Sequence, residues 1–234
     1  MKIGILQTGQ APEALRPSLG DYPAMFERLL GGHGLAFHTW HVEAMEFPAS
    51  VRDADGWLIT GSRHGVYEDH DFIAPLEQFI RDALEAGLPV VGICFGHQVM
   101  AQALGGKAEK FAGGWAVGAQ SYDFEGKELV LNAWHQDQVV VPPEGARTFA
   151  SNAFCAHAGL AYGKLGISVQ PHPEFDDAFI QGLIETRGRG LVPEDQLAQA
   201  AAQQGGQRDS DRIAAMIVNH FRQHAPAQAG VIGQ

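Results

Sequence analysis

The segment that most constrains the fold reads LPVVGICFGHQ and spans residues 88–98. Its first half is apolar and rich in β-branched residues, which is typical of a buried parallel strand. Its second half leads into HQVMAQAL, a helix-forming run that Gly105 and Gly106 bring to an end. A strand, a sharp turn and a helix in this order predict a nucleophile elbow with Cys94 at the turn.

The glycines on both sides of Cys94 give this interpretation a mechanical basis. A side chain at Gly92 or Gly96 would collide with the packed strand and helix next to so tight a turn. Cys94 would lie at the helix N-terminus, where unpaired amides and the positive end of the dipole favour a thiolate. The alternative is a buried cysteine in an ordinary strand–helix unit, since free cysteine often behaves as a small hydrophobic residue.

Short apolar strands alternate with amphipathic helices before residue 105. The predicted strands span 2–8, 35–42, 56–60 and 89–93, and helices are predicted after Asp21 and over 72–86. This is the βαβ pattern of an open, mostly parallel sheet in an α/β fold. Ligands of such sheets bind outside the carboxyl ends of the strands, and both Gly61 and Cys94 fall there.

The helical pattern then gives way to strands and turns over residues 107–170, with Gly-Lys pairs at 126–127 and 163–164 as tight hairpin turns. Because no linker separates this region from the preceding one, we predict that it extends the same sheet with antiparallel strands. Helices follow from residue 180, over 193–204 and over 211–224. We therefore expect a single domain over residues 1–225 and a flexible tail over 226–234.

Composition narrows the classes of partner. The 234 residues carry a formal net charge of −11, with a pI of about 5.4, so nucleic acid and anionic membranes are poor partners. Two cysteines do not make a disulfide framework, and the apolar run at the N-terminus is too short for a signal peptide. No run reaches the ~18 apolar residues of a membrane span. We expect a cytoplasmic protein.

A second motif provides a partner for a cysteine nucleophile, which needs a base within reach and a group that orients the base. The segment QPHPE, residues 170–174, follows an apolar strand. Side chains alternate along an extended chain, so His172 and Glu174 project to the same side, and the prolines favour that extension. Glu174 can then hold His172 in one tautomer while the ring faces the thiol. The alternative is a solvated strand end.

Three segments together resemble the class I glutamine amidotransferase (triad glutaminase) family, in particular a stand-alone form of the glutaminase of GMP synthase. The residues that carry the resemblance are GICFGHQ at 92–98, AWHQD at 133–137 and QPHPE at 170–174. They occur in the family's order, and the resemblance extends from the first strand to about Phe175, which is most of the chain. The resemblance implies a flavodoxin-like α/β fold and hydrolysis of a γ-glutamyl amide through a cysteine thioester.

The resemblance also implies the roles of single residues. Cys94 matches the nucleophile, His172 the general base and acid, and Glu174 the orienting acid. The backbone amides of Gly61 and Phe95 match the oxyanion hole, which stabilises the charge of the tetrahedral intermediate.

Substrate-binding positions follow in the same way. Gln98 matches the residue that faces bound glutamine, and His135 and Asp137 fall in the loop that lines the glutamine pocket. A turn between two strands is the alternative for that loop. The oxyanion loop departs from the frequent Gly-Gly-Pro: Gly61 is retained, but Ser62, Arg63 and His64 follow it. Arg63 is either a partner for a substrate carboxylate or an exposed loop residue.

Other motif searches are negative. The chain has no P-loop, no G-x-G-x-x-G after the first strand, no H-E-x-x-H and no C-x-x-C. We therefore predict no cofactor and no metal site. The Ser-Gly-Gly-x-Asp-Ser loop of ATP pyrophosphatases is also missing, so a synthetase that accepts the ammonia would be a partner subunit acting in trans.

Several functions stay open at this stage. One is a glutaminase subunit that releases ammonia from glutamine, and another is a stand-alone γ-glutamyl peptidase or hydrolase with the same triad. A third is a non-catalytic binding domain, against which the intact Cys94, His172 and Glu174 argue. A fourth, the cysteine-elbow chaperone or protease type of flavodoxin-like fold, lacks a His-x-Glu at the last strand and fits poorly.

Overall fold

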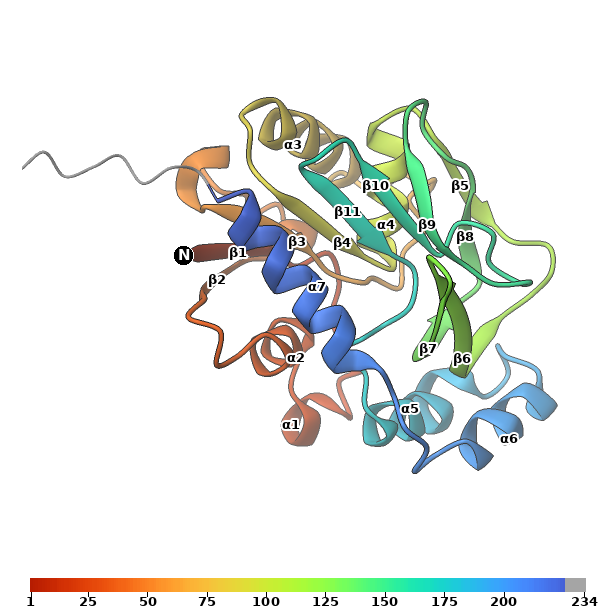
Figure 1. Cartoon of the computed structure of the whole chain (residues 1–234). Helices are drawn as coiled ribbons and strands as arrows, with labels where there is room; N and C mark the ends of the chain where they lie inside the picture. Colours follow the sequence, from red (N-terminus) through yellow and green to blue (C-terminus); the bar gives the residue numbers. More distant parts are fainter. Residues whose placement is uncertain (226–234) are drawn as a thin grey trace, which may run out of the picture.

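The computed structural model describes residues 1–225, so the predicted tail over 226–234 lies outside the described residues. Its centre is a nine-stranded sheet with the order β2-β1-β3-β4-β11-β10-β9-β6-β7 (Figure 1). Its strands are β1 (Lys2–Leu6), β2 (Ala36–Trp40), β3 (Gly56–Ile59), β4 (Val90–Ile93), β6 (Ala116–Phe124), β7 (Lys127–His135), β9 (Arg147–Ser151), β10 (Gly159–Tyr162) and β11 (Gly166–Val169).

The strands β2, β1, β3, β4 and β11 pair in parallel and form one half of the sheet. Strands β3 and β4 are buried along their whole length, which explains why their sequences are apolar without alternation. The predicted flavodoxin-like α/β fold is therefore confirmed.

Helices cover both faces of the parallel half (Figure 1). The helices are α1 (Arg16–Leu19), α2 (Tyr22–Leu29), α3 (Ile73–Glu85), α4 (Phe95–Ala103), α5 (Asp177–Leu183), α6 (Glu194–Ala202) and α7 (Ser210–Gln223), with 3₁₀ turns η1 (Val42–Ala44) and η2 (Val51–Asp53) and a π turn η3 (Ile184–Gly188). On one face Leu76 of α3 and Val99 of α4 belong to the same buried cluster as Trp57 of β3. On the other, Phe26 of α2 and Phe221 of α7 share a cluster with strand residues. In the described part of the chain, no helix has the length and apolar character needed to cross a membrane.

The other half of the sheet is antiparallel, as predicted, and consists of β10, β9, β6 and β7. The β6–β7 hairpin turns at Glu125 and Gly126, whose φ angles of 52° and 85° are typical of a tight hairpin turn. Helices α5 and α6 pack beside this half through Phe179, Leu197 and Val117.

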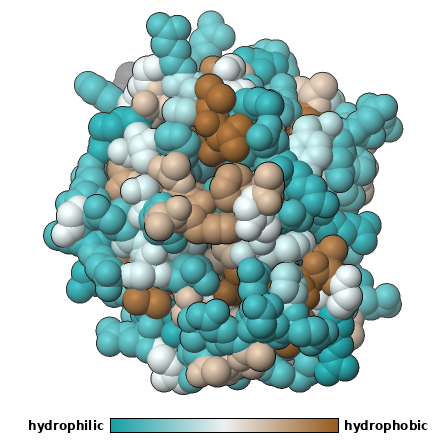
Figure 2. Space-filling model, turned by 90° about the vertical axis from the view of Figure 1, so that its right-hand side faces the viewer, coloured by the Kyte–Doolittle hydropathy of each residue, from teal (hydrophilic) through white to brown (hydrophobic). Residues whose placement is uncertain are grey.

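The prediction that all strands belong to one sheet is wrong. Strands β5 (Lys107–Lys110) and β8 (Asp137–Val141) pair only with each other in the described chain and form a two-stranded sheet. Their side of the molecule, seen in Figure 2, is mainly hydrophilic with separate hydrophobic patches. Other differences are local: α1 lies inside the predicted loop 9–20, and α5 begins at Asp177 rather than at residue 180 because Asp176 caps it.

Candidate active site

Cys94 lies at the turn between β4 and α4 in a strained backbone conformation. Its φ and ψ angles are 53° and −102°, a combination that a non-glycine residue rarely adopts. A Cβ atom at Gly92 would lie 2.4 Å from the carbonyl oxygen of Gly96, and one at Gly96 would lie 2.4 Å from that of Ile59. The structure therefore has the tight strand–turn–helix geometry that the glycine pattern predicts.

His172 and Glu174 follow β11, the strand that pairs with β4. His172 Nδ1 and Glu174 Oε1 are 2.7 Å apart, and the exposed fractions of the two side chains are only 4% and 0%. The Cys94 sulfur lies close enough to the His172 ring to be among the groups that raise its pKa. The structure therefore brings the three predicted triad residues together at the carboxyl edge of the sheet, with Cys94 and His172 on the same cleft.

Burial and neighbouring charged groups shift the pKa of His172 in opposite directions. Burial lowers the pKa of His172, but the nearby Glu174 carboxylate and Cys94 sulfur outweigh burial and raise this pKa to about 10. Because Nδ1 faces the carboxylate, the other ring nitrogen, Nε2, is left for the sulfur. The arrangement favours a protonated imidazole beside the sulfur at neutral pH.

Three residues that sequence reasoning missed hold His172 in place. The ring of Phe175 stacks on that of His172 with a centroid distance of 3.9 Å. Asn132 accepts the backbone N–H of His172 through its carbonyl oxygen, and its side-chain amide donates to the Phe175 carbonyl at 2.9 Å. Arg208 Nε donates to Asn132 Oδ1 at 2.9 Å. None of the three belongs to a local motif with His172, although Phe175 lies only three residues after it.

The predicted oxyanion positions lie next to Cys94 and His172. A Cβ atom at Gly61 would be 2.9 Å from His172 Cε1 and 3.7 Å from Cys94 Cβ, so only glycine fits there without displacing the ring. The Thr60 carbonyl accepts the N–H of Gly96, which fixes the peptide that carries the Gly61 amide. Phe95 is the first residue of α4, and an amide at that position has no intrahelical acceptor.

The three predicted substrate-binding residues all border the same cleft. Gln98 Nε2 donates to the Asp137 carbonyl at 3.0 Å and to Gln170 Oε1 at 3.1 Å. His135 and Asp137 were predicted in a loop, but the alternative, a turn between two strands, is what the structure has: His135 ends β7 and Asp137 begins β8. This correction has a simple cause, because β7 pairs with β6 along its whole length up to His135.

His135 and Asp137 differ in their ionisation. Burial, followed by the charge on His172, lowers the pKa of His135 to about 3, so this ring is neutral. Its Nδ1 lies 3.1 Å from the Asp137 carbonyl oxygen and therefore donates to it. Burial raises the pKa of Asp137, whose carboxylate accepts a hydrogen bond from the hydroxyl of Tyr67 at 3.1 Å.

The cleft beside Cys94 has a volume of about 390 Å³ and combines aromatic walls with charges of both signs. Its charged side chains other than the triad are Arg63, Glu68, Lys110, Asp137 and Arg187. Such a mixture suits a small zwitterionic ligand better than an apolar one. The sequence left two alternatives for Arg63, a partner for a substrate carboxylate or an exposed loop residue. In the structure, Arg63 is an exposed loop residue that also borders the cleft.

Comparisons with known proteins agree with this geometry. Residues 32–178 match the model of the family described as glutamine amidotransferase class-I. The chain is 28% identical to gamma-glutamyl peptidase 4 of Arabidopsis thaliana, over 74% of this chain and 75% of that protein. It is 36% identical to the glutamine-hydrolyzing GMP synthase of Methylobacillus flagellatus, over 58% of this chain but only 28% of that enzyme. A solved glutamine amido transferase from the same bacterium superposes with a TM-score of 0.76 at 19% identity, covering 100% of this chain and 98% of that chain.

Proposed function

Because this chain belongs to the class I glutamine amidotransferase family, we propose that it hydrolyses a γ-glutamyl amide through a thioester on Cys94. The observation that carries the proposal is the grouping of Cys94 with His172 on one cleft at the carboxyl end of β4, where Glu174 holds His172 Nδ1 at 2.7 Å. A cysteine beside a base that is itself oriented by a third group is the arrangement needed for covalent catalysis.

The proposed reaction has two halves. The sulfur of Cys94 attacks the γ-carbonyl carbon, and the amides of Gly61 and Phe95 stabilise the resulting oxyanion. His172 gives its proton to the leaving nitrogen, which departs as ammonia or an amine and leaves the γ-glutamyl thioester. His172 then takes a proton from water, whose oxygen attacks the thioester, and glutamate is released while the sulfur is restored. Glu174 keeps the ring of His172 oriented throughout.

The charges of the cleft support a substrate with a free glutamyl group. A γ-glutamyl compound carries an α-carboxylate and an α-ammonium, which both need partners when they leave water. Lys110 provides a positive charge along the cleft and Asp137 provides a carboxylate, whereas Arg63 and Arg187 lie where the cleft meets a neighbouring hollow. We assign the α-amino acid end of the substrate to Lys110 and Asp137 and the scissile amide to Cys94.

Glutamine is the first candidate substrate, with ammonia passed to a synthetase subunit in trans. The match to the family model and the likeness to the glutaminase part of GMP synthase support this choice. A protein of this kind gains from staying slow until its acceptor is loaded, because free ammonia is lost. Alone, it is then expected to hydrolyse glutamine with a kcat well below the ~10 s⁻¹ typical of enzymes.

A γ-glutamyl peptide is the second candidate, and one feature of the surface favours it. Arg63 and Arg187 border both the cleft of Cys94 and a neighbouring hollow of about 540 Å³, which also includes Arg16 and Glu43. The volume of that hollow leaves room for a leaving group larger than ammonia. The likeness to the plant gamma-glutamyl peptidase over about three quarters of both chains points the same way.

Two measurements test these proposals in sequence. A glutamine-like chloroketone should add once, on the peptide that contains Cys94, whereas Cys155 is buried with a pKa that burial raises to about 12 and should stay unlabelled. Labelling at Cys155 instead would disprove the assignment. The values of kcat/KM for glutamine and for γ-glutamyl peptides then separate the substrates, and a peptide preferred by about a hundredfold, roughly 2.7 kcal/mol, would establish the second candidate.

A further inference from the structure

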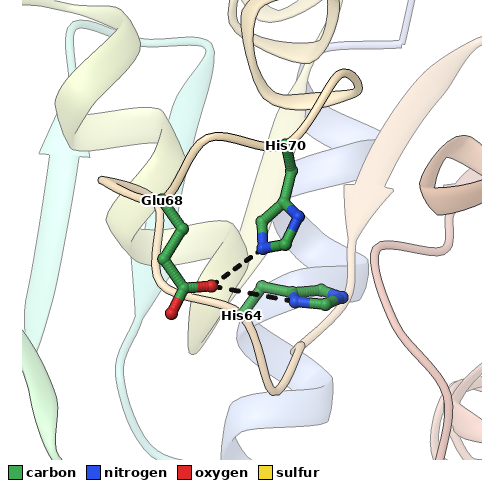
Figure 3. A group of neighbouring side chains, drawn as sticks. All are labelled: His64, Glu68 and His70. Atoms are coloured by element: carbon green, nitrogen blue, oxygen red, sulfur yellow. Dashed lines mark hydrogen bonds and ion pairs between the residues drawn. The ribbon is translucent and has the colours of Figure 1, made fainter.

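Three side chains of the loop between β3 and α3 converge outside the triad (Figure 3). They are His64, Glu68 and His70, and their ligand-type atoms all lie within 4.8 Å of one another. Glu68 Oε2 is 2.8 Å from His70 Nε2 and 3.8 Å from His64 Nδ1. One carboxylate oxygen therefore faces a nitrogen of each of two imidazole rings.

The orientation of His64 is fixed from a different part of the chain. Glu43 of η1 holds His64 Nε2 at 2.8 Å, although it is 21 residues away in the sequence. A carboxylate that accepts from Nε2–H leaves the lone pair on Nδ1, the nitrogen that faces Glu68. Metal-binding histidines characteristically donate their second ring nitrogen to a carboxylate in this way. Glu43 thus prepares His64 to act as a ligand.

We propose that His64 Nδ1, Glu68 Oε2 and His70 Nε2 bind a divalent metal ion of the Zn²⁺ class. Zinc binds imidazole and carboxylate at about 2.0–2.2 Å in tetrahedral geometry, which places two ligand atoms ~3.4 Å apart. The observed separations of 2.8 Å and 3.8 Å lie on either side of that value. Two imidazoles favour a transition metal over calcium or magnesium, which prefer oxygen ligands.

The position of the site connects it to the cleft. The same loop begins with Gly61 at Cys94, and both His64 and Glu68 border the cleft. An ion held by residues 64, 68 and 70 would close this loop into a ring and restrict its movement. The role we assign to the ion is to fix the loop, with the thiol chemistry left to Cys94. This inference does not depend on which γ-glutamyl substrate is hydrolysed.

The motifs considered in the sequence did not predict this site. The spacing is His-x₃-Glu-x-His, which differs from the H-E-x-x-H motif and the other metal signatures considered above. The expectation that the chain has no metal site came from those motifs alone. The missing information is the fold of the loop and the position of Glu43, neither of which is visible in the spacing.

The first test is a titration with Zn²⁺ of the Cys94→Ser chain. This background removes the thiol that, beside His172, is the competing place for a zinc ion. One Zn²⁺ per chain should bind with a micromolar or tighter dissociation constant. His70→Phe, which keeps an aromatic ring, and Glu68→Gln should each weaken binding by at least about tenfold, and Glu43→Gln by about tenfold. His33→Phe, an exposed histidine between α2 and β2, should bind as the parent does.

Further readouts in the native chain locate the ion. Co²⁺ should give d–d absorption without a thiolate charge-transfer band, and Zn²⁺ should slow tryptic cleavage after the exposed Arg63 but not after Lys164 in the β10–β11 turn. His70→Phe should abolish that protection while unfolding at the same temperature as the wild type in chelator. Unchanged affinity in both His70→Phe and Glu68→Gln, or a thiolate band that Cys94→Ser removes, would overturn the proposal.

Discussion

Two imidazole–carboxylate pairs in this protein have nearly the same local geometry and different surroundings. His172 and Glu174 are two residues apart with a nitrogen–oxygen distance of 2.7 Å, and Glu68 and His70 are two residues apart with a distance of 2.8 Å. The exposed fractions of the first pair are 4% and 0%, whereas those of His70 and Glu68 are 33% and 45%. The two pairs therefore differ in burial and not in their nitrogen–oxygen distance.

The difference in burial decides what each pair can do. A carboxylate out of water acts on its neighbour through a low dielectric, so Glu174 contributes to raising the pKa of His172 to about 10 against the effect of burial. Water weakens the exposed pair, whose hydrogen bond opens at little cost and leaves both ligand atoms free. The buried pair is suited to hold a proton, and the exposed pair to receive an ion.

The largest expected effect comes from removing the imidazole of the buried pair. His172→Asn should reduce γ-glutamyl hydrolysis by at least about 10³-fold, because both proton transfers are assigned to this ring. Glutamate release by the purified variant measures the effect, with circular dichroism as the check on folding. Activity near that of the wild type would show that another group is the base, and His135 would be the next candidate.

Removing the carboxylate of the buried pair should cost less. Glu174→Gln is expected to lower kcat/KM by about ten-fold to a thousand-fold, since a thiol depends less on its orienting acid than a hydroxyl does. Glu68→Gln, the matching change in the exposed pair, should cause a smaller loss. Equal losses in the two variants would contradict the distinction that burial makes between the pairs.

The same substitution should change how stability depends on pH. The pKa of His172 is raised to about 10 in the folded protein, against about 6.5 for an unperturbed histidine. Its contribution to the free energy of unfolding is therefore complete below about pH 6.5 and lost as pH rises through about 10. Glu174→Gln removes one cause of the raised pKa. The stability gap between wild type and variant, from urea unfolding, should narrow as pH rises from 7 to 10; a constant gap would contradict this account.

The fold was predictable where local pattern and tertiary environment agree. The apolar runs of β3 and β4 match their complete burial, and the glycines around Cys94 match the collisions that any side chain would cause. Strand β5 was missed because its sequence, KAEK, has charged residues at three of its four positions and little β-propensity. β5 is a strand because it pairs with β8, and this pairing cannot be predicted from the local sequence of β5.

The candidate site also contains residues that could be predicted from the sequence and residues that could not. Cys94, His172 and Glu174 lie in short motifs, so their types and spacing are visible in the sequence. Asn132 and Arg208 support His172 from β7 and from the segment before α7, at separations that only the folded chain makes short. Side chains that position others carry no chemical signature of their own, and sequence reasoning therefore misses them.

A moderate effect is expected from this support of the buried pair. Asn132→Ala keeps the backbone hydrogen bond to His172 but removes the side-chain bonds to Phe175 and Arg208. The loss of buried hydrogen bonds should lower the free energy of unfolding by about 1–3 kcal/mol. If Asn132 positions His172, kcat should fall with little change in KM. Asn219→Ala, at an exposed position of α7, is the control, and a change in KM alone would contradict the positioning role.

The smallest effect is expected when the exposed pair is broken in the absence of metal. His70 does not border the cleft, and its ring packs between His64 and Phe72 at centroid distances of 4.1 Å and 5.9 Å. His70→Phe keeps an aromatic ring there, so in chelator its kcat/KM should stay within about twofold of the wild type, in line with the ~0.5 kcal/mol of a typical surface change. A tenfold loss in chelator would place the exposed pair in the catalytic machinery and end the contrast with His172 and Glu174.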